Sequence, residues 1–346
     1  MKYIKQTIKL LGIILTAILI AGTAYLYSSG PILPEETDDI IESTIATQLP
    51  HLILGNVGFA DNKGVNIWYE SIENKDSCKG AILLIMGISN DAMGWPPNFI
   101  QAFVDEGYQV IRYDHRGTGM SDWMNDWEST NPYSITDMAN DAVSVLDALK
   151  IDKATIVGVS MGGMIAQEMA VHHPDRVKSL TSIMSSGFIQ DPNLPPISSN
   201  VAEELIKVGL KYGIVGGEKN LIKLHLASRK ILMGNAIHDL NTKSLAQQTL
   251  YNIRKRKGYN PKVSKQHQVA VSISGSRYED LMRLDIPSLI IHGKLDPFIP
   301  IEHGQKCASL IPNSDSLWID NMGHDIPDVF INTIAKRIIE NEKRVL

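Results

Sequence analysis

The chain has 346 residues, of which 44% are hydrophobic and 21% charged, and its formal net charge is −5. This length supports one large domain or two ordinary ones, and the balance of apolar and charged residues excludes a disordered chain. A slightly acidic chain also lacks the basic excess of a nucleic-acid-binding protein, so we expect no nucleic-acid partner.

Residues 1–30 have the composition of a targeting segment. Three lysines precede an uncharged apolar run at 10–27. Because positive residues tend to stay in the cytoplasm, this order predicts that the rest of the chain is exported. The run is just long enough for an uncleaved signal anchor, which would leave the protein membrane-bound and facing away from the cytoplasm. A signal peptide cleaved near the small residues 22–24 is the alternative and predicts a periplasmic or secreted protein.

The next predicted elements are a tether and a hairpin. Residues 31–50 contain three prolines among polar and acidic residues, which is typical of a tether. Two β-rich runs, at 56–60 and 65–71, flank the turn sequence Asp-Asn-Lys-Gly and predict a β-hairpin.

Strands and helices alternate after the hairpin. Apolar runs predict buried strands, and a 3.6-residue period predicts helices. We expect strands at 81–87, 108–114, 154–160, 179–186, 288–294 and 316–320, and helices at 98–107, 135–150, 161–173, 301–310 and 326–343. Helices of this length between strands indicate an α/β fold, with a mostly parallel sheet covered by helices on both faces.

The alternation is interrupted between residues 187 and 281, where loops and helical patterns occur without a convincing strand. The sequence therefore predicts a core formed by 51–186 and 282–346, with a helical insertion at 187–281.

A Gly-Val-Ser-Met-Gly sequence lies where a predicted strand becomes a helix. Ser160 would occupy a very sharp turn, and Gly158 and Gly162 would remove side chains that collide there. The N–H of Met161 would lie at a helix N-terminus, where backbone donors are unpaired and the potential is positive. The pattern predicts a nucleophilic serine with Met161 as an oxyanion donor; a small-residue turn used only for close packing is the alternative.

A serine nucleophile needs a histidine base and an orienting carboxylate. Ligands of such sheets bind at the carboxyl ends of strands, and Asp296 and His324 follow the last two predicted strands. We expect Ser160, His324 and Asp296 to form a catalytic triad. His115 is the best rival base because it also follows a strand, and Asp320 is the alternative carboxylate.

A second oxyanion donor is expected from the loop after the first parallel strand. Gly87 would let the backbone approach the serine, and the Ile88 N–H is the candidate donor. Gly87 as a simple strand-end turn is the alternative.

From about residue 57 to its end, the chain resembles the α/β-hydrolase superfamily. The segments "RYDHRGTGMSD", "GVSMGG", "HGKLDPFIP" and "NMGHDIP" match its turn, nucleophile, acid and histidine motifs. Within it, "IMGISNDAMGWP" and "SGSRYEDLMRLDIPSLIIHG" are similar to the aclacinomycin methylesterase-like branch. The resemblance implies an enzyme without metal or organic cofactor that cleaves carboxylic esters. It also implies that the insertion is a helical cap and that Asp114 and Arg116 maintain a structural turn.

The leading functional prediction is therefore a serine hydrolase that cleaves small-molecule carboxylic esters through an acyl-enzyme. An aminopeptidase or amidase, and a perhydrolase, are alternatives that use the same triad. A non-catalytic hydrolase-fold binding protein is a further alternative, although such proteins usually lose one triad member.

Two features of the sequence stay open. Residues 202–265 contain thirteen Lys and Arg but four Asp and Glu, and the run Arg-Lys-Arg-Lys at 254–257 is the densest part. This basic segment is either a solvated helix face or a surface for anionic lipid or substrate. Cys78 and Cys307 are either separate thiols or, in an oxidising compartment, one disulfide.

Overall fold

The computed structural model describes residues 11–13, 16–17, 21–22, 30–73, 78–214 and 216–344. Over these ranges no helix has the length and apolar character that a bilayer span requires. The anchor or signal peptide predicted for residues 1–30 lies mainly outside the described residues.

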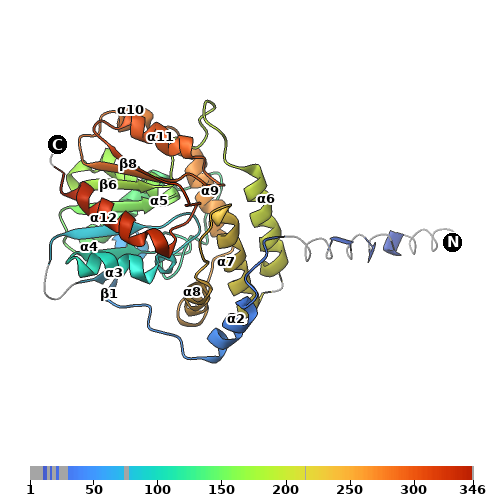
Figure 1. Cartoon of the computed structure of the whole chain (residues 1–346). Coiled ribbons are helices and arrows are strands. Elements are labelled where there is room, and N and C mark those ends of the chain that lie inside the picture. Colours follow the sequence, from blue (N-terminus) through green and yellow to red (C-terminus); the bar gives the residue numbers. More distant parts are fainter. Residues whose placement is uncertain are drawn as a thin grey trace.

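Eight strands of the described chain form one sheet in the order β1-β2-β4-β3-β5-β6-β7-β8 (Figure 1). The strands are β1 (Asn56–Asn62), β2 (Val65–Ile72), β3 (Ala81–Ile85), β4 (Gln109–Tyr113), β5 (Ala154–Val159), β6 (Val177–Ile183), β7 (Ser288–Gly293) and β8 (Asp315–Ile319). β1 and β2 form the predicted hairpin, and β2 also pairs antiparallel with β4. All other neighbours are parallel, which confirms the predicted fold class.

Helices cover both faces of the sheet because the central strands are apolar on both. Along β3, Leu83 and Ile85 pack with α4 (Ile135–Ala148) and α5 (Met161–His172), which lie on one face. The alternate residues Ile82 and Leu84 pack with α3 (Pro97–Asp105) and α12 (Ile331–Glu342) on the other face. A further helix of the body, α11 (Ile301–Leu310), follows β7. Every residue of β3, β5 and β7 is buried, as expected for strands covered twice.

Between β6 and β7, the described residues 184–214 and 216–287 form helices and loops but no strand. We call residues 187–281 the cap. Its helices are α6 (Ser199–Val208), a π-helical stretch (Gly209–Gly213), α7 (Glu218–Met233), α8 (Thr242–Lys255), α9 (Val263–Ile273) and α10 (Tyr278–Leu281). α6, α7 and α8 stand beside the sheet rather than over either face (Figure 1).

The segment predicted as a tether is a helix over Thr37–Ala46, α2. Ile41 of α2 is fully buried and packs with Ile222 of α7 and Leu250 of α8. The prolines that suggested a tether flank this helix instead of interrupting it, so they do not prevent it from forming. The tether prediction is therefore wrong for these ten residues.

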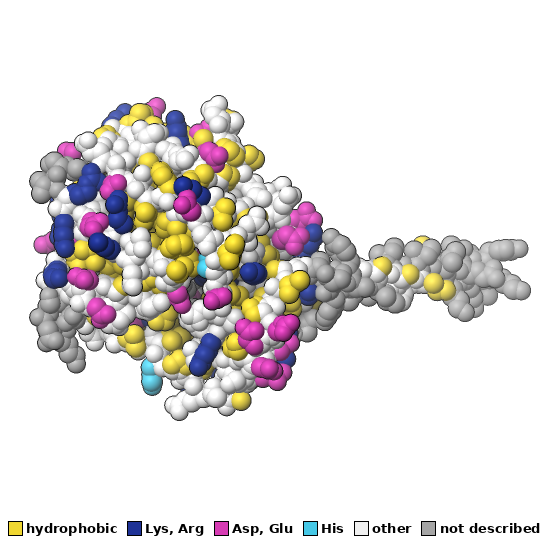
Figure 2. Space-filling model, viewed as in Figure 1, with side chains coloured by type: hydrophobic (Ala, Val, Ile, Leu, Met, Phe, Trp, Pro, Cys, Tyr) yellow, Lys and Arg dark blue, Asp and Glu magenta, His cyan; other side chains and the backbone are white. Residues whose placement is uncertain are grey.

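Acidic residues of α2 neutralise part of the basic cap. Lys219 Nζ lies 2.7 Å from Glu42 Oε1, and Lys223 Nζ lies 2.6 Å from Asp38 Oδ1. In Figure 2, acidic side chains gather at the end of the body where α2 lies. The net positive charge of the cap sequence is thus partly balanced by the residues that precede the core.

The two cysteines are separate thiols. Cys78 is exposed, whereas Cys307 of α11 is buried, and burial raises its pKa to about 11. No disulfide joins them in the described structure.

Candidate active site

Ser160 lies between the last residue of β5 and the first residue of α5, in a conformation that few side chains adopt. Its backbone angles are φ 55° and ψ −123°. A Cβ at Gly158 would collide with the Gly162 carbonyl, and a Cβ at Gly162 would collide with the carbonyls of Ile85 and Met86. Only glycines fit at these two positions, so the local sequence allows the strained turn that lifts Ser160 off the sheet edge.

The other two predicted triad residues meet Ser160 at this edge. His324 Nε2 lies 3.0 Å from Ser160 Oγ, and His324 Nδ1 lies 2.7 Å from Asp296 Oδ2. Asp296 follows β7 and His324 follows β8, and both strands run parallel to β5 within the same sheet. Because an ionised carboxylate only accepts, Nδ1 carries the proton and Nε2 is free to accept one from the serine.

Asp296 is held as a carboxylate by its surroundings. Its Oδ1 accepts the N–H groups of Phe298 and Ile299, each at 2.9 Å, and its Oδ2 also lies 3.3 Å from His292 Nε2. Burial alone would raise the pKa of Asp296, but the imidazoles of His324 and His292 lower it well below its ordinary value. The ionised form is therefore maintained beside His324, where it orients the ring.

The two predicted oxyanion donors, the N–H groups of Met161 and Ile88, belong to segments that adjoin Ser160. Met161 is the first residue of α5, so its N–H has no acceptor within the helix. A Cβ placed on Gly87 would lie 3.3 Å from Ser160 Cβ, which puts the Gly87–Ile88 peptide against the serine. Within the described residues, the Ile88 N–H donates no backbone hydrogen bond. Both N–H groups therefore remain candidate donors to the carbonyl oxygen of a substrate attacked by Ser160.

A model of the alpha/beta hydrolase fold matches residues 80–329. The chain belongs to the α/β-hydrolase family. A rhodomycin D methylesterase of a Streptomyces species is 27% identical over 275 residues, which cover 76% of this chain and 90% of the relative. The predicted similarity to the methylesterase branch is thereby confirmed.

Solved structures of other α/β-hydrolases superpose on most of the chain. An esterase of a Rhodococcus species gives a TM-score of 0.62 at 20% identity and covers 82% of this chain and 96% of its own. A membrane phospholipase A, described as a bacterial virulence factor, gives a TM-score of 0.62 at 18% identity and covers 97% of this chain and 99% of its own. At these identities the likeness shows the fold alone.

The rival residues of this α/β-hydrolase point elsewhere. His115 is buried, and its Nε2 lies 2.8 Å from the Met86 carbonyl oxygen rather than at the serine. Burial lowers the pKa of His115 to about 4. The Asp320 side chain is 86% exposed and pairs with Lys294. Among the described residues, no group of three or more His, Cys, Asp or Glu is placed to hold a metal ion.

Cap residues that sequence reasoning missed hold the loop that carries His324. The His324 N–H donates to the Leu232 carbonyl at 2.8 Å. Asn321 Oδ1 accepts the Ile237 N–H at 2.7 Å, and Asn321 Nδ2 donates to the Ile237 carbonyl at 2.8 Å. Leu232 and Ile237 make these contacts through backbone atoms, so their side chains could not have indicated the contacts in the sequence. Asn321 makes its contacts through its side-chain amide, and its position close to His324 is the signal that the sequence offered.

Three of the four side chains in the basic run at 254–257 make contacts within the protein, and one of the three is buried. Arg254 pairs with Glu218, and Lys257 Nζ donates to the carbonyls of Met120 and Ser121. The Arg256 side chain is only 3% exposed and pairs with Asp114. Arg256 therefore belongs to neither a solvated face nor a lipid-binding surface, whereas Arg254, Lys255 and Lys257 are exposed.

Proposed function

We propose that the protein is a serine hydrolase that cleaves carboxylic esters through an acyl-enzyme formed on Ser160. The observation that carries this proposal is the continuous chain of contacts from Ser160 Oγ through His324 to Asp296, with distances of 3.0 Å and 2.7 Å. The similarity to a rhodomycin D methylesterase supports an ester as the substrate class.

In the proposed mechanism, Ser160 Oγ attacks the ester carbonyl carbon while His324 Nε2 takes the hydroxyl proton. The Met161 and Ile88 N–H groups stabilise the oxyanion of the tetrahedral intermediate. The intermediate collapses, the C–O bond to the alcohol breaks, and His324 returns the proton to the leaving alcohol. Water then attacks the acyl-enzyme by the same proton relay and releases the acid.

Replacing the nucleophile tests this proposal. Ser160→Ala should lower kcat on a panel of p-nitrophenyl esters and lactones by about 10⁴-fold or more, because the base and the oxyanion donors have no nucleophile to serve. Ser309→Ala, which changes an exposed serine of α11, is the matched control and should retain parental turnover. Ester hydrolysis by Ser160→Ala at the parental rate would rule the assignment out.

We also propose that the catalytic body is exported and held at a membrane by residues 1–30, or released if that segment is cleaved. The support is the order of lysines, apolar run and acidic residues in the sequence. The full chain should sediment with membranes and resist alkaline extraction, whereas a chain that begins at residue 30 should not. Recovery of the full-length, uncleaved chain in the cytosol would contradict the proposal.

A further inference from the structure

The loop that carries Ile88 is held by two buried imidazoles, and one of them comes from the cap. His115 Nε2 lies 2.8 Å from the Met86 carbonyl oxygen, at the start of the loop. His267 of α9 lies 3.1 Å, through its Nδ1, from the backbone nitrogen of Ser89. The two rings meet edge to face with their centroids 5.7 Å apart. Ile88 therefore lies between two backbone groups that are both fixed by histidines.

The contacts of His267 determine its tautomer. Its Nε2 lies 3.0 Å from the Arg116 carbonyl oxygen, which only accepts, so Nε2 carries the hydrogen. Nδ1 then presents a lone pair to the Ser89 N–H. Burial, together with the neighbouring His115, lowers the pKa of His267 to about 3, so the ring stays neutral and keeps that lone pair.

The backbone that His267 holds is strained. Ser89 has φ 63°, a conformation that non-glycine residues seldom adopt. In the adjacent turn, the Asn90 N–H lies 3.3 Å from the Gly87 carbonyl oxygen, and Asn90 Nδ2 donates to the Ile88 carbonyl at 3.1 Å. A strained conformation persists where its surroundings stabilise it, and here the His267 contact satisfies the Ser89 N–H. Rotation of this turn would change the direction of the Ile88 N–H next to Ser160.

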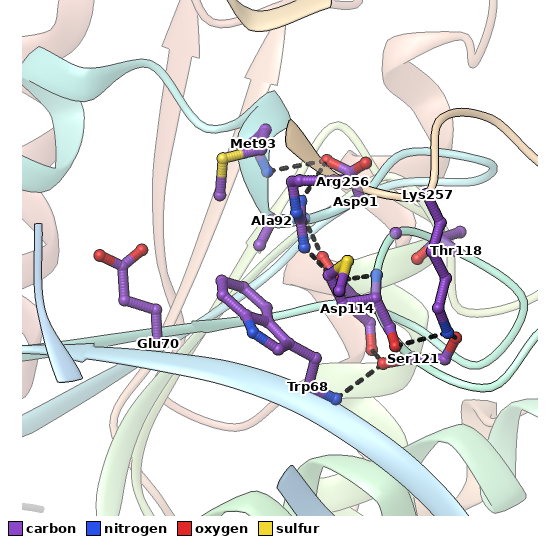
Figure 3. Close-up of polar contacts among 12 residues, drawn as sticks. Trp68, Glu70, Asp91, Ala92, Met93, Asp114, Thr118, Ser121, Arg256 and Lys257 are labelled. Atoms are coloured by element: carbon purple, nitrogen blue, oxygen red, sulfur yellow. Dashed lines mark hydrogen bonds and ion pairs between the residues drawn. The ribbon is translucent and has the colours of Figure 1, made fainter. Parts of the chain in front are cut away.

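The cap holds the same loop at a second position, shown in Figure 3. Arg256 reaches between Asp91 and Asp114, with its Nη1 3.5 Å from Asp91 Oδ1, and its guanidinium lies 4.5 Å from the Trp68 ring centroid. Asp114 Oδ1 accepts the Ala92 N–H at 3.0 Å, so the acidic residue after β4 and the cap arginine support the loop together. The loop from Met86 to Ala92 is thus supported from the core and from the cap.

We propose that His267 is a positioning residue for the oxyanion hole: it holds the Ser89 backbone so that the Ile88 N–H is directed at the oxygen that develops charge. This inference rests on the proposed serine hydrolase function. It means that a helix inserted outside the sheet contributes to stabilisation of the transition state, through a residue that touches neither the substrate nor the triad.

Two replacements of His267 test its two contacts separately: Nδ1 accepts from the Ser89 N–H, and Nε2 donates to the Arg116 carbonyl. Asn places an amide oxygen near the position of Nδ1 and can still accept from Ser89, whereas Gln places its amide near Nε2 and can only retain the Arg116 contact. His267→Gln should lower kcat by about 10- to 100-fold with KM changed less than about threefold, because a misaligned oxyanion donor loses part of its usual effect. His267→Asn should recover most of that loss.

Affinity for an alkyl boronic acid provides a second readout, since its tetrahedral serine adduct places an oxygen in the oxyanion hole. This affinity should fall in proportion to kcat/KM across the variants. Gln266→Leu is the matched control, because Gln266 is buried one residue earlier on α9 but donates to the Met124 carbonyl instead. It should leave both the boronic acid affinity and kcat per active site at the parental values, with active sites counted by fluorophosphonate labelling.

The inference is overturned if His267→Gln matches the parent in kcat and boronic acid affinity, if His267→Asn is as impaired as His267→Gln, or if Gln266→Leu is impaired equally. These outcomes can be distinguished from a failure of the proposed serine hydrolase function itself. That failure would appear in the parental protein as absent ester hydrolysis, or as hydrolysis that Ser160→Ala does not reduce.

Discussion

Gly158, Ser160 and Gly162 could be predicted because the chemistry that requires them is local. The strained turn needs glycines two residues before and after the serine, and both positions face backbone carbonyls at distances that exclude a Cβ. His267 could not be predicted in the same way. It contacts a residue 178 positions away in the sequence, and nothing in its own segment distinguishes it from a histidine in a helical core.

The buried histidines should make the protein sensitive to acid. An unfolded histidine takes up a proton near pH 6.5, whereas burial lowers the pKa of His115 to about 4 and that of His267 to about 3. Below about pH 6.5, the unfolded chain therefore binds protons that the folded protein does not, and the free energy of unfolding decreases as the pH falls. Each of these histidines lowers the free energy of unfolding by about 1.4 kcal/mol for every pH unit below about 6.5, until the pH reaches the pKa of that histidine in the folded protein.

This effect is measurable from urea midpoints near pH 7.5 and near pH 5. His115→Phe should reduce the loss of stability between them by about 2 kcal/mol, because one such histidine no longer titrates. His51→Gln alters an exposed histidine and should leave the loss unchanged. An identical pH dependence in the parent and His115→Phe would contradict the account.

Among the secondary-structure elements, the strands were the most predictable, since each central strand is an uninterrupted apolar run. Helix α2 was not predicted, because its apolar residues are spread among acidic ones and its flanking prolines are typical of a linker. Helix α2 is stabilised by the packing of Ile41 against α7 and α8. This tertiary contact exists only in the folded cap, so the local sequence does not indicate it.

Shortening the Ile41 side chain should therefore destabilise both α2 and the cap helices that it contacts. Ile41→Ala removes a fully buried side chain, which typically costs about 2 to 5 kcal/mol. Hydrogen exchange should accelerate in the amides of α2 and in the facing turns of α7 and α8. Ile32→Ala changes an isoleucine that is 91% exposed in the same segment and should have no such effect. Unchanged protection of α2 in Ile41→Ala would show that the contact does not stabilise it.

For the whole molecule, the sheet explains how residues 160, 296 and 324 come together. Parallel strands end at one edge, so side chains that follow β5, β7 and β8 meet there although they are far apart in sequence. The sequence indicated the strands and the order of the three residues. It did not indicate how the cap is seated, because that depends on backbone contacts such as those of Leu232 and on Arg256 inserted between two carboxylates.

The most direct test of the central claim is the reaction of the full-length protein with a fluorophosphonate, followed by intact mass and peptide mapping. The account predicts one adduct per chain, located on Ser160, absent in Ser160→Ala and formed far more slowly in His324→Ala. A protein that remains unlabelled, or an adduct on another residue, would contradict it.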